Sequence, residues 1–285
     1  MIVKEYEDAG LFLKDYEVYM MKKEAVSQLL LYPAYQSLPT AEPGKELYGA
    51  VLEEQEPVLL FCNKPGYKLV FLSLRQENSV AATTALADFF GCNHVSIAGI
   101  SARQELCQSF IDQYSKYISG SFLQKQESDI MELIKVNELK PVSGVQRLAT
   151  PSEVKLVTDW LLRFQMETLM SELDYEAALI MATKLIEEEK LYLYENEDQT
   201  VVSMAAIYKK LLRGIMITYI YTPEEYRGNG YAAVNVYYLS KMLLSQGYEF
   251  CALLADKKNP LSIRAYEKVG YEILEDICEY MMIVP

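Results

Sequence analysis

The segment from Tyr221 to Ala232 joins an apolar run to a helical pattern, and it constrains the fold more than any other stretch of the chain. Residues 214–220 are apolar and favour a strand, whereas residues 231–246 place apolar side chains on one face and favour a helix that ends at a glycine. Gly228 and Gly230 lie in the loop between them. A glycine-bearing loop that opens a helix gathers free N–H groups and the positive end of the helix dipole at one place, which suits a phosphate.

Two common phosphate loops are not favoured. Gly228-Asn-Gly230-Tyr-Ala-Ala233 fits a loose dinucleotide pattern, but five residues with a proline, 222–226, separate it from its strand, and no βα alternation follows. A glycine-Lys-Ser/Thr ending of the nucleotide-hydrolase type does not occur. Arg227 adds a fixed cation to the loop.

A second strand and helix follow directly. Residues 250–255 favour a short apolar strand. Asn259 is a suitable helix N-cap, Pro260 a suitable first helical residue and Gly270 a suitable stop. We expect residues 272–274 and 279–284 to form closing strands.

These two segments carry a family resemblance. Arg227-x-x-Gly230-x-Ala232 resembles the acetyl-CoA signature of the GNAT N-acetyltransferase superfamily, Gln/Arg-x-x-Gly-x-Gly/Ala. The segment from Asn259 to Tyr271 is similar to the second motif of the superfamily, and its matching positions are Asn259, Ser262, Tyr266, Gly270 and Tyr271. The resemblance extends from about Val145 to the C-terminus.

The second half also has the element order of that superfamily. Pro141 and Gly144 mark a junction, so we predict a GNAT acetyltransferase domain over residues 142–285. Thr150, Pro151 and Glu153 combine three helix-start signals. The predicted elements are a strand at 145–148, helices at 152–170 and 175–188, and a hairpin of 190–195 with 200–208.

The first half, residues 1–141, is predicted to repeat this order as a degenerate GNAT-like domain. The alternative is an unrelated α+β domain. The predicted elements are helices at 11–31, 79–90 and 102–117 and strands at 47–54, 57–62, 67–74, 94–98 and 130–136. Residues 75–79 contain no glycine pair, so this half is not expected to bind CoA. The fold class is therefore α/β, with a mixed sheet and tandem GNAT-like domains.

The resemblance implies which residues bind acetyl-CoA and which catalyse transfer. The implied cofactor-binding residues are Ile220, Tyr221, Thr222, Arg227, Gly228, Asn229, Gly230, Tyr231, Ala232, Asn259, Ser262 and Tyr266. Main-chain N–H groups bind the diphosphate, and the N–H of Ile220 or Tyr221 polarises the thioester carbonyl. Tyr266 holds the position of the general acid that faces the leaving thiolate. Asn259 can also serve as a cap alone.

The sequence does not identify the general base. Residues 215–221 carry no carboxylate. Glu167, Glu172 and Asp174 lie where the first two helices of this half meet, a region that lines the acceptor site in the superfamily. They could attract a cationic amine or form a solvated helix face. Glu224 and Glu225 lie on the loop.

Composition narrows the class of partner. The formal charge of −13 disfavours a nucleic-acid backbone. Five scattered cysteines indicate buried thiols in a reducing compartment, and no metal site is expected. The chain has a single histidine, His94, so a Ser-His-Asp mechanism is not expected. The chain shows no signal-like segment or bilayer-spanning run, which favours a cytoplasmic enzyme.

The predicted function is acetyl-CoA-dependent acyl transfer to a primary amine of a small molecule or peptide, by direct attack in a ternary complex. A cationic acceptor and a homodimer are left open. Two alternatives remain: a non-catalytic acyl-CoA-binding or sensing module, and a tandem-GNAT aminoacyl transferase that uses charged tRNA.

Overall fold

The computed structural model describes residues 1–38, 46–140, 142–169 and 173–283, which group into two compact units. Unit 1 comprises Met1–Ser128 with Glu275–Pro285, and unit 2 comprises Asp129–Leu274. Compared with the predicted ranges 1–141 and 142–285, residues 129–140 group with the second unit and residues 275–285 with the first.

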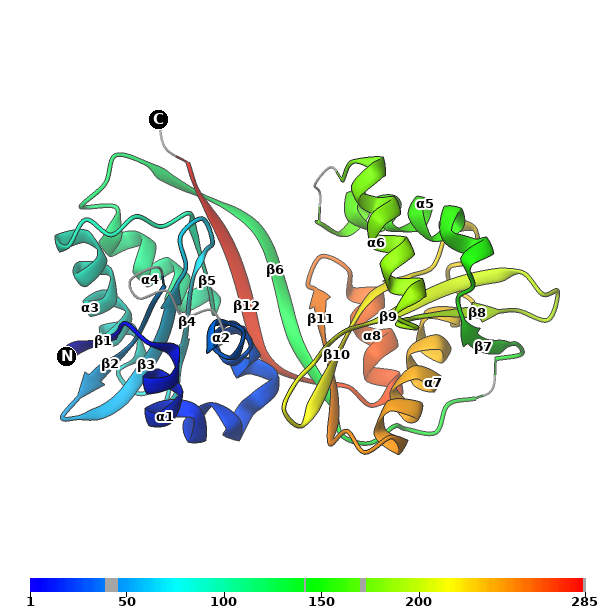
Figure 1. The fold of residues 1–285 in the computed structure, drawn as a ribbon, viewed down its shortest axis with the longest axis horizontal. Helices are drawn as coiled ribbons and strands as arrows, with labels where there is room; N and C mark the ends of the chain where they lie inside the picture. Colours follow the sequence, from blue (N-terminus) through cyan, green and yellow to red (C-terminus); the bar gives the residue numbers. More distant parts are fainter. Residues whose placement is uncertain (39–45, 141, 170–172, 284–285) are drawn as a thin grey trace. The chain divides into compact units, whose positions relative to one another are not determined.

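The same series of elements, β-α-α-β-β-β-α-β-α-β, occurs twice along the chain (Figure 1). The first series is β1 (Ile2–Tyr6), α1 (Ala9–Met20), α2 (Glu24–Ser37), β2 (Leu47–Glu53), β3 (Glu56–Asn63), β4 (Leu69–Ser73), α3 (Ser79–Cys92), β5 (Gly99–Ala102), α4 (Gln104–Tyr114) and β6 (Ser121–Leu133). The second is β7 (Val145–Leu148), α5 (Val154–Phe164), α6 (Tyr175–Glu187), β8 (Leu191–Glu195), β9 (Val201–Lys210), β10 (Gly214–Tyr221), α7 (Tyr231–Ser245), β11 (Phe250–Asp256), α8 (Pro260–Val269) and β12 (Glu272–Ile283). The predicted tandem arrangement is thus confirmed.

Strand pairing is also repeated. In unit 1, β1 to β4 pair antiparallel in chain order, and β4 pairs parallel with β5. In unit 2, β7 to β10 pair antiparallel in chain order, and β10 pairs parallel with β11. A parallel pair needs a crossover connection. The crossovers are α3 in unit 1 and α7 in unit 2, so each unit carries one strand–loop–helix–strand segment at the same place.

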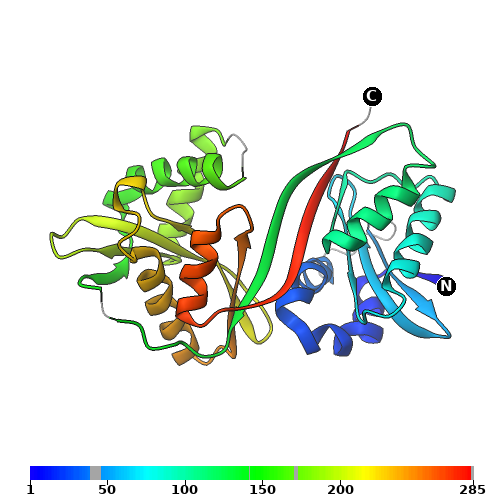
Figure 2. The same cartoon turned by 180° about the vertical axis from the view of Figure 1, so that it is seen from behind.

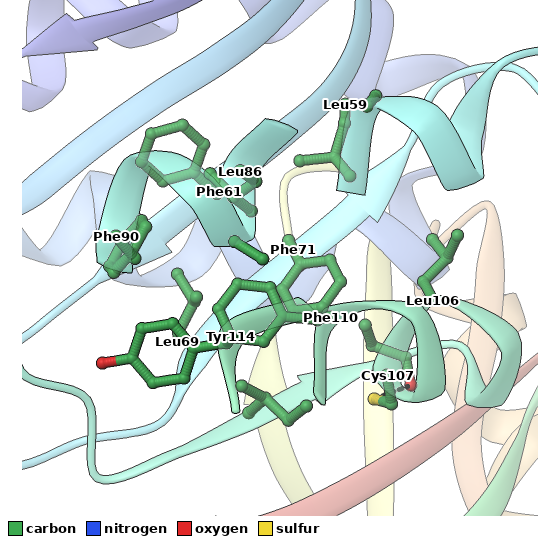
Figure 3. Close-up of a cluster of buried hydrophobic side chains, with 14 of the residues drawn as sticks. Leu59, Phe61, Leu69, Phe71, Leu86, Phe90, Leu106, Cys107, Phe110 and Tyr114 are labelled. Carbon is green, nitrogen blue, oxygen red and sulfur yellow. Dashed lines mark hydrogen bonds between the residues drawn. The ribbon is translucent and has the colours of Figure 1, made fainter. Parts of the chain in front are cut away.

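Each unit has a hydrophobic core on both faces of its strands. Helices cover these faces in each unit (Figures 1 and 2). In unit 1, α1 and α2 cover one face and α3 and α4 the other. Figure 3 shows the second of these cores, in which Phe71, Phe90 and Phe110 pack between the strands and the two helices. In unit 2, α5 and α6 cover one face and α7 and α8 the other.

The last strand of each series contributes core residues to the unit that contains the rest of the other series. Met131 and Leu133 of β6 are buried against α7 and α8 in the core of unit 2. Cys278 and Tyr280 of β12 are buried in the core of unit 1, where β12 pairs antiparallel with β5. Gly99 permits this pairing, because a Cβ there would lie 2.1 Å from the carbonyl oxygen of Tyr280.

Several predicted elements were wrong in detail. The strand predicted at 94–98 is absent: α3 runs to Cys92, residues 93–95 form its capped end with His94 at a left-handed φ of 53°, and β5 begins at Gly99. The helix predicted at 11–31 is two helices separated by the 3-10 turn Met21–Lys23. The two predicted closing strands form the single strand β12. Pro141 and Met170 lie outside the described residues.

Candidate functional site

The loop between β10 and α7 has the conformation that its glycines predict. Gly228 and Gly230 have φ of 83° and 82°, in the left-handed region that glycine enters without a steric penalty. A Cβ added to Gly228 would meet no heavy atom within 4 Å, and one added to Gly230 would meet only a Val142 methyl at 3.6 Å. The glycines therefore fix the course of the loop and leave its face uncovered by protein atoms.

The main-chain donors of this loop converge at the start of α7. A 3-10 turn, η5 (Glu224–Tyr226), closes with the N–H of Arg227 donating to the carbonyl of Glu224 at 3.1 Å. The helix then begins with the N–H of Val234 donating to the carbonyl of Gly230 at 3.1 Å, and no side chain caps it. Within the described residues, the N–H groups of 228–232 have no recorded protein acceptor. Such orphan donors at the positive end of a 15-residue helix suit an anion.

β10 separates from its parallel neighbour before it reaches this loop. The recorded pairing with β11 covers only Gly214–Met216 against Phe250–Ala252. On its other edge, the register with β9 shifts between Thr218 and Tyr221, and Tyr219 lies in this bulge with a φ of 49°. The main chain after Met216 is thus released from the β11 ladder, as an added strand-like ligand would require.

A buried polar network fixes the end of β10. The Ser203 hydroxyl donates to the carbonyl of Tyr221 at 3.2 Å, and the Asn235 side-chain amide donates to Ser203 at 3.4 Å. Gln146 donates to the Asn235 side-chain oxygen at 2.6 Å. Ser203 and Asn235 are fully buried. Sequence analysis missed this network, because its members lie in four different elements and carry no motif.

The side chain of Arg227 is held beside the loop by protein groups. Its Nε donates to the carbonyl of Thr222 at 2.9 Å, and its guanidinium forms an ion pair with Glu167 and lies over the ring of Tyr221. Glu167 belongs to the π-helical turn η4 (Gln165–Leu169) that follows α5, and its other oxygen accepts from the Tyr221 hydroxyl at 3.0 Å. The Thr222 hydroxyl is buried and has no hydrogen-bond partner among the described residues.

Tyr266 lies in the core between α7, α8 and the separated strands. Only 6% of its surface is exposed, and it packs in the same cluster as Ile217, Leu253 and Ala255. Its ring contacts that of Tyr271 edge-on at 6.2 Å. Burial raises the pKa of its phenol above the usual range. No protein group of the described residues hydrogen-bonds to its hydroxyl, so this oxygen is free to bind a ligand atom.

The remaining predicted residues either cap helices or lie exposed on the loop. Asn259 caps α8 by accepting from the N–H of Ser262 at 3.2 Å, and the Ser262 hydroxyl donates back to the Asn259 carbonyl at 2.8 Å. Asp174 caps α6, while Glu224 and Glu225 are exposed on η5. Glu172 lies outside the described residues. Of the predicted acceptor-side carboxylates that are described, only Glu167 contacts the loop.

A pocket of unit 2 with a volume of about 420 Å³ contains no residue of this loop. It is lined by the end of β6 and the residues after it, by the end of α8 and by the start of β12. Over the described ranges, no cluster of three or more histidine, cysteine or acidic side chains is arranged to hold a metal ion. Among the helices that the structure describes, none has the length and apolar character needed to cross a bilayer.

The fold and site define an α/β protein with two similar units, of which one has an open glycine loop with unpaired main-chain N–H groups at a strand separation. Residues 154–271 match the Acetyltransferase (GNAT) family, and this range contains both predicted motifs. The C-terminal half of the chain therefore carries a GNAT-family domain, which confirms the resemblance found in the sequence.

Solved structures show the same fold over the whole chain. A GNAT-family acetyltransferase from Colwellia psychrerythraea has a TM-score of 0.52 at 13% identity and covers 99% of both chains. A Drosophila protein has a TM-score of 0.60 at 11% identity and covers 100% of this chain and 99% of its own. A GCN5-related N-acetyltransferase from Sphaerobacter thermophilus has a TM-score of 0.54 at 14% identity, with 88% and 86% covered. The comparison with curated proteins gave no match.

Proposed function

We propose that unit 2 is an acyl-CoA-dependent N-acyltransferase that uses acetyl-CoA to acylate a primary amine of a small molecule or peptide. The observation that carries this proposal is the open loop at the start of α7. Five consecutive N–H groups, 228–232, have no recorded protein acceptor there, and two left-handed glycines keep side chains away from them. These residues fit a diphosphate.

The other predicted residues have matching tasks. The main chain of β10 beyond Met216 lies free of β11, so it can hydrogen-bond to the amides of a pantetheine arm. The N–H of Ile220 or Tyr221, in the bulged end of the strand, then faces the thioester carbonyl. Such a donor can stabilise a developing oxyanion by about 3 kcal/mol. Ser203 holds this end of the strand in place through the carbonyl of Tyr221.

Tyr266 is suited to hydrogen-bond to the leaving sulfur. Acetyl-CoA, when bound, supplies the acyl group and a thiolate whose pKa is about 8.5, like that of cysteine. Because burial raises the pKa of Tyr266 above that value, its phenol stays protonated and offers a donor at neutral pH. Full proton transfer from the phenol is uphill, so we propose that Tyr266 stabilises the leaving thiolate by donating a hydrogen bond to its sulfur.

The acceptor is proposed to be cationic. The formal charge of −13 favours the approach of a cation. Glu167 contacts Tyr221 at the end of β10, which supports a carboxylate near the acyl group. We further propose that the enzyme is cytoplasmic and uses no metal. A homodimer stays a prediction.

Calorimetric titration with acetyl-CoA tests the proposal. We expect one binding site per chain, and Gly228→Ala should weaken binding about tenfold, since an L side chain strains the left-handed loop and intrudes on its face. Gly247→Ala is the matched control, because Gly247 has a φ of 99° at the opposite end of α7 and equally open space. A folded wild-type protein that binds no acetyl-CoA would sink the proposal.

A screen of amines that follows thiol release from acetyl-CoA then separates catalysis from sensing. Release with at least one amine excludes the non-catalytic module. Binding of acetyl-CoA without release from any amine, together with salt-dependent binding of tRNA, would favour the aminoacyl transferase instead.

A further inference from the structure

Arg227 and Glu167 connect the phosphate loop to the turn that follows α5. The guanidinium of Arg227 pairs with one oxygen of Glu167, while the other oxygen accepts from the Tyr221 hydroxyl at 3.0 Å. Tyr221 in turn lies 5.9 Å from Trp160, ring to ring. The side chain of Arg163 also lies near Tyr221, and Glu224 lies near Arg227 on η5. One carboxylate thus neutralises the cation that follows β10.

This ion pair is of the kind that exchanges easily. The side chains of Arg227 and Glu167 are 46% and 44% exposed. Exposed ion pairs contribute little because water screens them, whereas an arginine that binds a diphosphate gains two charge-assisted hydrogen bonds to a doubly charged group. Gly228, the next residue, begins the run of orphan donors, so the long side chain of Arg227 can reach an anion held there.

The loop also holds a polar group that its present contacts do not satisfy. Thr222 is 9% exposed, and its hydroxyl is buried without a partner among the described residues. Its carbonyl accepts from Nε of Arg227 at 2.9 Å. A buried hydroxyl without a hydrogen bond is costly, which indicates that the contacts around Arg227 are completed in another arrangement.

We propose that Glu167 is a positioning residue for the cofactor: it pairs with Arg227 in the free protein and releases the guanidinium when a diphosphate binds to the loop. Arg227 then turns to the diphosphate, and the carboxylate of Glu167 is released beside Tyr221. Binding of the cofactor thereby exposes a negative charge at the end of β10, on the side of α5. This inference rests on the proposed function, since it needs CoA in the loop.

A calorimetric cycle with CoA tests the exchange. Removing the competing carboxylate in Glu167→Gln should tighten CoA binding about threefold at low salt, which is the range of an exposed ion pair, and the gain should shrink at high salt. Pantetheine, which has no diphosphate, should bind both proteins equally. Glu225→Gln is the matched control, because it removes an exposed carboxylate of η5 that has no recorded contact with Arg227.

The Arg227→Gln background shows whether Glu167 acts through Arg227. In that background Glu167→Gln should leave the dissociation constant of CoA unchanged. An equal gain with and without Arg227, or weaker CoA binding in Glu167→Gln, would overturn the exchange. A role of Glu167 in folding alone would shift pantetheine binding as much as CoA binding.

Fluorescence provides a second readout. Trp160 is the single tryptophan of the chain and contacts Tyr221. CoA should change its emission in the wild type and change it less in Glu167→Gln, where no carboxylate is released. Identical responses in the two proteins would contradict the inference. Absence of CoA binding in the wild type would instead show that the proposed function is wrong.

Discussion

The two units place the same strand–loop–helix segment at the same point along their strands, yet only in unit 2 does the loop of this segment contain glycines. In unit 2, nine residues, 222–230, lead from β10 to α7 and include two left-handed glycines. In unit 1, only five residues, 74–78, lead from β4 to α3. The residue before α3 is Asn78, with a φ of 60°.

Unit 1 fills the corresponding place with its own carboxylate. The side chain of Asn78 donates to both oxygens of Glu53 at 2.9 Å, and Arg75 pairs with the same carboxylate at 2.7 Å. An arginine follows the strand in both units, and both arginines pair with a glutamate. The difference lies in the main chain. Two left-handed glycines leave room for a ligand in unit 2, whereas in unit 1 the carboxylate of Glu53 is bound at the start of α3 through Asn78.

The helices that follow β5 and β11, α4 and α8, also differ between the two units. Tyr266 is the seventh residue after the N-cap of α8, and Phe110 is the seventh after the N-cap of α4. Phe110 is fully buried and packs against Phe71 and Tyr114. The phenol hydroxyl is thus missing from unit 1 at the place where unit 2 provides it. Unit 1 thus has the core of this fold without the phenol hydroxyl of Tyr266.

The largest expected effect breaks the loop of unit 2. Gly230→Val places a β-branched side chain at a φ of 82°, which costs about 1–3 kcal/mol and covers the donors, so acetyl-CoA affinity should fall at least about tenfold. Asn78→Val strains the start of α3 in the same way and should leave that affinity unchanged. Calorimetry measures both, and a loss of half the sites in either variant would show that both units bind.

The next effect concerns the two aromatic positions. Tyr266→Phe should lower turnover about a hundredfold with little change in acetyl-CoA affinity, because it removes a donor to the leaving group. Phe110→Tyr should leave turnover unchanged and destabilise the protein by about 1–3 kcal/mol, since it buries a hydroxyl without a partner. Thiol release and thermal melting distinguish the outcomes. Unchanged turnover in Tyr266→Phe would remove this residue from the mechanism.

A smaller effect concerns the anchor of β10. Ser203→Ala leaves the carbonyl of Tyr221 and the amide of Asn235 without this partner, so it should cost about 1–2 kcal/mol of stability and weaken acetyl-CoA binding a few fold. The corresponding strand of unit 1, β3, is apolar at Val58–Leu60. Denaturant titration and calorimetry check this prediction. A loss of stability without any loss of affinity would mean that Ser203 does not position the site.

The smallest expected effect is a pH dependence of the free energy of unfolding, caused by Glu153 at the start of the first helix of unit 2. Hydrogen bonds from Arg147 and from Thr150 lower the pKa of Glu153 despite its partial burial. A lowered pKa stabilises the folded state above the unfolded value of about 4.3, and this contribution is lost as pH falls through the folded value. Glu153→Gln should cost about 1 kcal/mol of stability at pH 7, and the cost should shrink as the pH falls below the unfolded value and through the folded value. Melting curves of the wild type and the variant, measured between about pH 3 and pH 7, check this prediction. An equal difference in stability at every pH would contradict the linkage.

Local signals were sufficient to predict much of the site. The caps Thr150, Asn259 and Gly270 and the glycine loop act within a few residues of sequence, and the structure has them where the pattern predicts. The partners of these elements could not be predicted in the same way. Glu53 meets Asn78 across 25 residues, Glu167 meets Arg227 across 60, and Gln146 meets Asn235 across 89. Only the packed sheet brings these residues together.

The exchanged last strands have a consequence for how the chain is made. Because Cys278 and Tyr280 complete the core of unit 1, a nascent chain that has passed residue 128 still lacks part of that core. Residues 275–283 must therefore be synthesised before unit 1 can close around β12 and complete its core. A deletion of residues 275–283 would destabilise unit 1, although the rest of that unit lies at residues 1–128.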